Sequence, residues 1–206
     1  MRIFISILFA YLIGAIPTAV WVGKYFYKKD VREYGSGNAG ATNTFRVLGK
    51  IPGIFVLMFD VFKGGLAINN PAVIYFHLQS NFDLQIALGL VAVIGHIFPV
   101  YVGFRGGKGV AILLGIVFSL HPITAVIALV VFLIVFLSSG FVSLGSITAA
   151  IVFPIILFLM EKDLAFSHAV FALSVSVLTL ITHKKNIQKL LKGEENRVNF
   201  ITKNNP

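Results

Sequence analysis

The stretch Gly95-His96-Ile97-Phe98-Pro99, continued by Phe104-Arg105-Gly106-Gly107-Lys108-Gly109-Val110, lies between two long apolar segments. Its glycines let the backbone approach a ligand closely, and its two cations supply charge for an anion. A helix beginning near Val110 would point the positive end of its dipole at the same place. Local composition allows two interpretations: a phosphate-binding loop where the chain leaves a membrane, or a short basic turn between two spanning helices.

The composition is that of an integral membrane protein. Of the 206 residues, 57% are hydrophobic and 12% are charged, and the mean hydropathy is +0.91. A soluble domain carries about 25% charged residues. The chain has no cysteine, which excludes disulfides and Cys-based metal sites or nucleophiles. The net charge of +9 comes from cations between the apolar runs, as membrane topology requires, so no nucleic-acid partner is expected.

Seven apolar runs predict an all-α bundle of seven transmembrane helices. His121-Pro122 divides the longest run, because proline disfavours the helical conformation in the residue before it. The small residues of Ser138–Ser146 predict a loop. The predicted spans are Ile3–Val22, Ile51–Ile68, Leu84–Val102, a short fourth from Val110 to the His-Pro pair, Pro122–Leu137, Ile147–Met160 and Leu164–Thr182.

The distribution of cations predicts an outside N-terminus and a cytoplasmic C-terminus. With this orientation the 17 Lys and Arg residues fall on the inner face, except Arg2, Lys162 and the intramembrane Lys63. The first run lacks a strong basic flank and a small-residue cleavage site, so it is interpreted as a retained span. We expect a single membrane-embedded domain over residues 1–198 and a polar C-terminal tail, 199–206, that need not be ordered.

Two further polar segments fall on the predicted cytoplasmic face. Residues 35–43 combine three glycines with Ser, Thr and two Asn, ahead of Arg46. They predict either a ligand-binding backbone or a flexible loop that caps the next helix. In the segment from His183 to Glu195, His183 and Asn186 share a face if the last helix continues. The lysines of that segment are explained by a helix end meeting anionic lipid.

Together the three segments resemble a known set of motifs. Ser-Gly-Asn-Ala-Gly-Ala-Thr-Asn with a following Arg, Gly-His-x-Phe-Pro followed by Gly-Gly-Lys-Gly-Val, and His-x-x-Asn-Ile ahead of Gly-Glu-Glu are similar to the motifs of the bacterial acyl-phosphate:glycerol-3-phosphate acyltransferases. The resemblance runs from the first span to about Arg197. It departs at Ala39, where Pro is frequent, and at Lys184, where Arg is frequent.

The resemblance implies a transferase of phospholipid biosynthesis. It would move a fatty acyl group from acyl phosphate to glycerol 3-phosphate, giving lysophosphatidic acid and phosphate. It would lie in the bacterial plasma membrane as a multi-pass protein with its site facing the cytoplasm, in contact with membrane lipid. Separately, we expect a monomer with no cofactor and no metal. The alternative function that the residues leave open is a small membrane carrier for an anion such as phosphate.

The resemblance also implies residue roles. Lys108 with Gly106, Gly107 and Gly109 would hold the phosphate of the donor through N–H groups and one ammonium. Ser36 and Arg46 would bind phosphate groups, and His183 and Asn186 would position the acceptor and the reacting carbonyl. The expected catalytic residues are Ser36, Arg46, Lys108, His183 and Asn186. The expected substrate-binding residues are Gly37, Asn38, Gly40, Thr42, Asn43, Gly106, Gly107, Gly109, Ser143 and Ser146.

The proton of the attacking hydroxyl has two possible acceptors, His183 and a substrate phosphate. None of the five histidines has Asp five positions later, which excludes the His-x4-Asp chemistry of soluble-type acyltransferases. Absence of an Asp/Glu cluster with metal-ligand spacing disfavours metal-dependent transfer.

The intramembrane charges, Asp60 and Lys63, are interpreted as a structural pair with a functional role as the alternative. His96 is expected to be structural, and His77, His121 and His168 lie near the outer side and are not expected to be catalytic.

Overall fold

The computed structural model describes residues 1–161 and 163–198, and these residues form helices and connections without any strand. The predicted tail, 199–206, lies outside the described residues. The helices are α1 (Arg2–Gly14), α2 (Thr18–Tyr27), η1 (Val31–Glu33), α3 (Ala41–Leu48), α4 (Lys50–Ile68), α5 (Pro71–Tyr75), α6 (Phe82–Ile97), η2 (Val100–Val102), α7 (Val110–Leu120), α8 (Pro122–Ser139), α9 (Val142–Met160), α10 (Phe166–Thr182) and α11 (Lys184–Leu191).

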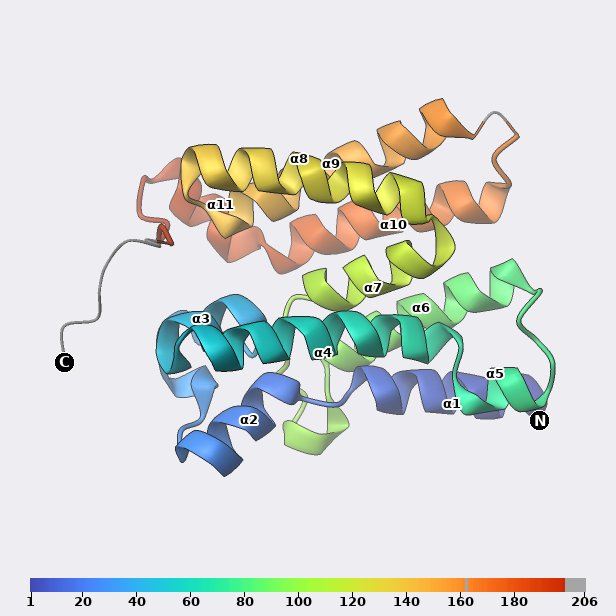
Figure 1. Ribbon diagram of the computed structural model, residues 1–206, viewed down its shortest axis with the longest axis horizontal. Helices are drawn as coiled ribbons and strands as arrows, with labels where there is room; N and C mark the ends of the chain where they lie inside the picture. The colour runs from blue at the N-terminus through green and yellow to red at the C-terminus, as the bar shows by residue number, and fades with distance from the viewer. Residues whose placement is uncertain (162, 199–206) are drawn as a thin grey trace.

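The helices form two layers with α7 between them (Figure 1). Helices α1 to α6 make one layer and α8 to α11 make the other, while α7 packs on α4 and on α8. Helices α2, α3 and α11 lie at one end of the molecule, which we call the polar end. The N-terminus and α5 lie at the opposite end.

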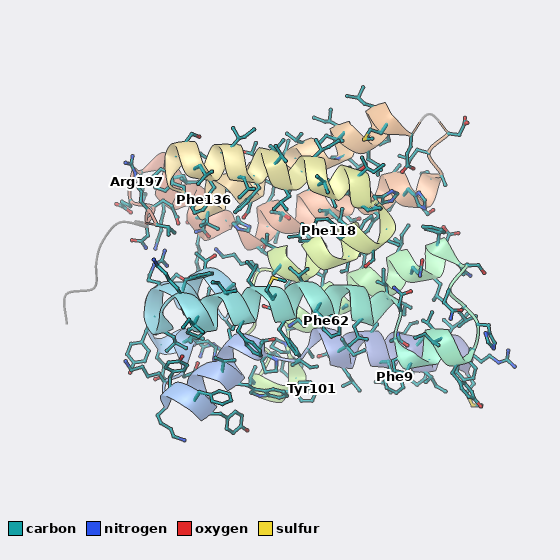
Figure 2. All side chains as sticks on the ribbon, viewed as in Figure 1. Phe9, Phe62, Tyr101, Phe118, Phe136 and Arg197 are labelled. Carbon is teal, nitrogen blue, oxygen red and sulfur yellow. The ribbon has the colours of Figure 1, made fainter. Side chains whose placement is uncertain are left out.

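The chain is a multi-pass membrane protein. Among the described residues, four helices are long and apolar enough to cross a bilayer, or up to six spans if each of two bent pairs counts as one. Helix α7 has 11 residues and is therefore about 16 Å long, which is short of the ~30 Å of the hydrocarbon core. Large apolar side chains point outward along the helices, among them Phe9 and Phe62 with 40% and 62% of their surface exposed (Figure 2). Such a surface is suited to lipid rather than water.

Helix boundaries confirm some predictions and correct others. A helix break at His121-Pro122 is confirmed, with proline in the first turn of α8. The predicted loop over Ser138–Ser146 is wrong, because α8 continues to Ser139 and α9 begins at Val142. Gly140, with φ of 78°, allows this tight connection. The third predicted span, Leu84–Val102, agrees with a candidate span over Phe82–Val102, in which α6 stops at Ile97 and the short 3-10 helix η2 follows Pro99.

The first predicted span is also not one straight helix. Helices α1 and α2 meet at 44° next to Pro17, because proline interrupts helical hydrogen bonding. Lys63 of α4 donates to the Ile16 carbonyl at 2.7 Å, and Thr18 donates to Asp60 at 2.8 Å. Lys63 and Asp60 also pair with each other at 2.8 Å, and each residue is 1% exposed. The pair therefore fastens α4 to the bend while its two charges compensate each other.

Replacing Lys63 by methionine is expected to destabilise the protein by about 3–5 kcal/mol, because the Asp60 carboxylate would remain buried without a cation. Thermal unfolding of the detergent-solubilised protein measures this effect. The double variant Asp60→Asn/Lys63→Met removes both charges and should regain most of the loss. A single variant as stable as the wild type would contradict a structural role for the pair.

Candidate active site

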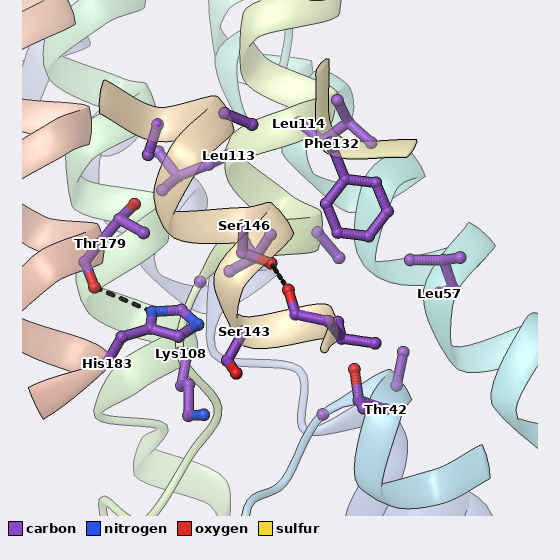
Figure 3. Close-up of a pocket in the computed structure, with 18 of the residues that line it drawn as sticks. Thr42, Leu57, Lys108, Leu113, Leu114, Phe132, Ser143, Ser146, Thr179 and His183 are labelled. Carbon is purple, nitrogen blue, oxygen red and sulfur yellow. Dashed lines mark hydrogen bonds between the residues drawn. The ribbon is translucent and has the colours of Figure 1, made fainter. Parts of the chain in front are cut away.

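A cavity of about 470 Å³ opens at the polar end and extends among α4, α7, α8, α9 and α10 (Figure 3). Polar side chains line its opening, and apolar side chains line its deeper part. Three of the predicted site residues, Gly37, Gly106 and Gly107, do not line it. The predicted residues that do are Ser36, Asn38, Gly40, Thr42, Asn43, Arg46, Lys108, Gly109, Ser143, Ser146, His183 and Asn186.

Lys108 is held by a chain of two polar contacts. Its Nζ donates to Asn186 Oδ1 at 2.5 Å, and Asn186 Nδ2 donates to the Glu195 carboxylate at 3.0 and 3.1 Å. Burial lowers the pKa of Lys108 to about 8; the charge of Glu195 acts against this, while the nearby cations Arg46 and Lys189 add to it. The ammonium is therefore close to its titration range at neutral pH.

Glu195 was assigned no role from the sequence. It belongs to the Gly-Glu-Glu of the third motif, but it lies nine residues beyond Asn186. The chain returns to the cavity because Gly193 adopts a φ of 72° after α11, and the Val198 N–H then donates to the Gly140 carbonyl. The Gly-Glu-Glu motif was the sequence signal that could have pointed to Glu195. The contact of Glu195 with Asn186 depends on the turn at Gly193.

His183 lies at the bend of 62° between α10 and α11 and is 3% exposed. Its Nδ1 donates to the Thr179 carbonyl at 2.8 Å, since a carbonyl can only accept. Nε2 is therefore the acceptor, and the ring projects toward Ser143 and Lys108 (Figure 3). Burial, and then the positive charge of Lys108, lower the pKa of His183 to about 4, so the imidazole is neutral at physiological pH.

The glycine-rich segment 35–43 is held in place by Asn43. This amide accepts from the Ser36 N–H at 2.8 Å and donates to the carbonyls of Val31 and Tyr34 at 2.7 and 3.1 Å. Asn43 is 1% exposed, and the polar atoms of its side chain form hydrogen bonds with the backbone of the loop. Asn43 thus has a positioning role, and because it also lines the cavity its predicted part in substrate binding stays a prediction. Ser36 and Arg46 remain exposed at the opening of the cavity.

Gly106 and Gly107 pack against the end of α6. Their N–H groups donate to the carbonyls of Ile97 and His96 at 3.0 and 3.1 Å, which terminates α6. A Cβ at Gly106 would clash with the His96 carbonyl, and one at Gly107 would clash with the His96 ring. The expectation that these two N–H groups bind a phosphate is therefore wrong, because both are already used. Lys108 and Gly109 are the members of this stretch that line the cavity.

The two predicted serines lie on the first turns of α9 rather than in a loop. Ser146 Oγ donates to the Val142 carbonyl at 2.9 Å. Ser143 Oγ is buried and has no hydrogen-bond partner within the part of the chain that the structure describes. An unpaired buried hydroxyl is costly, and this one lines the cavity, so a ligand can satisfy it.

Arg32 connects two of the polar segments, which the sequence did not indicate. Its guanidinium forms two bonds with Asp30, at 2.9 and 2.7 Å, and a third with the Val102 carbonyl at 2.8 Å. The bonds from Arg32 hold the pKa of Asp30 well below its usual range. The segment before α3 is thereby fixed to the segment before α7. Among the described residues, no group of three or more His, Asp or Glu side chains is arranged to hold a metal ion.

Residues 4–193 match the family described as glycerol-3-phosphate acyltransferase. The chain belongs to this family. It is accordingly an acyltransferase, and its relatives of the same name include one from Fusobacterium nucleatum, 44% identical over 206 residues, covering 97% of this chain and all of the relative. Another, from Staphylococcus haemolyticus, is 40% identical and covers 98% of this chain and all of the relative.

The fold of the acyltransferase also matches solved structures. Crystal structures of PlsY (YgiH), an integral membrane glycerol 3-phosphate acyltransferase, are 36% identical and cover 97% of this chain and 96% of theirs. The glycerol 3-phosphate form gives a TM-score of 0.87, and the lysophosphatidic acid form gives 0.84.

Proposed function

We propose that this acyltransferase moves a fatty acyl group from acyl phosphate to glycerol 3-phosphate, releasing phosphate and forming lysophosphatidic acid. The observation that carries the proposal is one continuous cavity with cations and polar groups at its opening and apolar walls beyond. Such a cavity suits a donor with an anionic head and a hydrocarbon tail. The crystallised relatives are named for forms with glycerol 3-phosphate and lysophosphatidic acid, which supports this acceptor and this product.

In the proposed reaction, a hydroxyl oxygen of glycerol 3-phosphate attacks the acyl carbon. The bond between that carbon and the phosphate oxygen breaks, and phosphate leaves with the electron pair. Lys108 and the free N–H groups at the start of α7 neutralise its charge. Ser36 and Arg46 hold phosphate at the opening of the cavity, and Asn186 keeps the ammonium of Lys108 in position.

The hydroxyl proton passes to a substrate phosphate in this proposal, while His183 orients the reacting groups through Nε2. The low pKa of His183, about 4, makes the free imidazole a weak base. A phosphate monoester has a second pKa of about 6 and is the stronger base of the two. Ser143 supplies an added donor, since its hydroxyl is buried beside His183 without a partner in the described chain.

We further propose that residues 1–198 form a single domain of seven spans, with the N-terminus outside and the C-terminus in the cytoplasm. The protein would act as a monomer in the bacterial plasma membrane, with the site facing the cytoplasm. Lys24, Arg32, Arg46 and Lys108 all lie in or beside the segments at the polar end, in agreement with the positive-inside rule. The fourth of these seven spans is the short helix α7, whose length of about 16 Å covers only part of the hydrocarbon core.

The donor is tested by measuring phosphate and lysophosphatidic acid from purified protein given glycerol 3-phosphate and either acyl phosphate or acyl-CoA. We expect product with acyl phosphate and at most a trace with acyl-CoA. Efficient use of acyl-CoA would overturn the proposed donor. Transport of phosphate into vesicles without any lysophosphatidic acid would instead favour a carrier, although the deep end of the cavity is closed by buried Phe153, Leu157 and Phe171.

A further inference from the structure

The apolar part of the cavity has a measurable length. Along α9, lining residues run from Ser143 at the polar opening to Phe153, and along α8 they run from Phe136 to Ala125. At a rise of 1.5 Å per residue, these distances are about 15 and 16 Å. Helices α8 and α9 are consecutive and antiparallel, so both describe the same axis of the cavity.

The cavity ends at Phe153. This side chain is 2% exposed, and its ring packs edge-on against Phe171 at a centroid distance of 6.3 Å and an angle of 85°. Leu157, one turn further along α9, is fully buried and no longer lines the cavity. Val117 of α7 and Ala125 of α8 close the same level from the other sides. The end is therefore a packed floor rather than an opening.

Small side chains form the walls above this floor. Ala128 of α8 and Ala149 and Ala150 of α9 line the cavity between the serines and Phe153. Ala149 is only partly buried, because its methyl group borders the open space. The preceding residue of α9, Thr148, is also partly buried but does not line the cavity. A leucine at 149 would consequently occupy the space, whereas a leucine at 148 would not.

We propose that Phe153 as the floor and Ala149 as the wall set the length of the acyl chain that the enzyme accepts. The inference rests on the proposed function, since it takes the fatty acyl donor as the occupant. An extended alkyl chain with C–C bonds of about 1.5 Å advances about 1.25 Å per carbon. A depth of about 15 Å then holds about twelve carbons. Each carbon up to that number gains contact with the walls, and further carbons do not.

The test is a series of acyl phosphates with about 6 to about 18 carbons, assayed at fixed glycerol 3-phosphate for kcat/KM. For the wild type, kcat/KM rises with chain length and stops rising near twelve carbons. Ala149→Leu should lower kcat/KM for chains of twelve carbons about tenfold relative to about six carbons, because Ala149 lies about 9 Å beyond Ser143, at the level of about the seventh carbon. Phe153→Leu and Phe153→Ala should shift the limit to longer chains; the leucine variant preserves more packing if alanine impairs folding. Thr148→Leu is the matched control, because it places the same side chain at the adjacent position, and it should keep the wild-type profile.

The outcomes separate this inference from the proposed function. If the wild type and Ala149→Leu both turn over acyl phosphate with the same dependence on chain length, the inference is overturned and the proposed function stands. If the wild type turns over no acyl phosphate of any length, the proposed function fails and the inference fails with it. A shift in Ala149→Leu equal to that in Thr148→Leu would also overturn the inference, because the effect would not come from the cavity.

Discussion

Replacement of Lys108 by methionine is expected to lower kcat/KM with acyl phosphate by about 10²–10³-fold, because in the proposed reaction the ammonium neutralises the departing phosphate. Methionine retains the length and the apolar stem of lysine while it removes the charge. The contact with Asn186 Oδ1 is lost as well, but the carboxylate of Glu195 keeps its bonds to Nδ2. Initial rates of phosphate release over a range of donor concentrations measure the change.

The same residue predicts a pH dependence. The pKa of Lys108 is about 8, and in the proposed reaction the protonated form is the active one. The pH dependence of kcat/KM reports the pKa values of the free enzyme. The kcat/KM of the wild type should therefore be at its plateau below pH 7, where Lys108 is protonated, and should fall as the pH rises through about 8. Lys108→Arg keeps a charge at all these pH values, so the alkaline decline should disappear in whatever activity remains.

Arg105→Met is the matched control for both experiments. Arg105 lies in the same loop and also carries a positive charge, but it is exposed and does not line the cavity. Its replacement should leave kcat/KM within about twofold, as expected for a surface charge. A Lys108→Met variant that retains more than a tenth of the wild-type value would contradict the proposed role of the ammonium.

Replacement of His183 by alanine is expected to lower turnover by about 10²–10⁴-fold, whether the imidazole takes a proton or orients the substrates. His183→Gln distinguishes these roles. A glutamine amide can donate to the Thr179 carbonyl and present an oxygen to the cavity, but it cannot act as a base. If orientation is the role, His183→Gln should recover at least tenfold over His183→Ala.

His77→Asn serves as the control, because His77 is exposed at the opposite end of the molecule and its positive φ of 55° suits asparagine. We expect the turnover of His77→Asn to equal that of the wild type. Near-normal turnover in His183→Ala would exclude both roles. Equal activity of His183→Ala and His183→Gln would favour the imidazole as the base.

The sequence was sufficient to predict features that depend on composition and on neighbouring residues. Apolar runs located most helices, and His121-Pro122 located the break between α7 and α8. The bend at Pro17 was missed, because the run is long and apolar enough for one span and the groups that fasten the bend, Asp60 and Lys63, lie more than 40 residues away. The start of α9 was placed too late, since small residues such as Ser143 and Gly145 are as compatible with packed helices as with loops.

The candidate site was predicted where polar residues cluster in the chain. The structure then separated the residues that line the cavity from those that hold the backbone in place. Asn43 and Gly106 turned out to hold the backbone in place. The contact between Asn186 and Glu195, and the bonds from Arg32 to the second loop, need the folded chain to bring them together. A one-dimensional pattern does not separate a group that meets the substrate from one that supports it.

The fit of Gly106 and Gly107 against His96 changes how genetic data on this loop should be interpreted. Any side chain there would push the loop away from α6 and displace Lys108, which follows directly. Substitutions at these glycines would then raise KM for the phosphate-bearing substrate although neither residue touches it. In a mutational scan the two glycines would be indistinguishable from ligand contacts. A structure would tell them apart, and at Gly107 so would a suppressor that shortens the His96 side chain, whereas Gly106 faces the His96 backbone carbonyl.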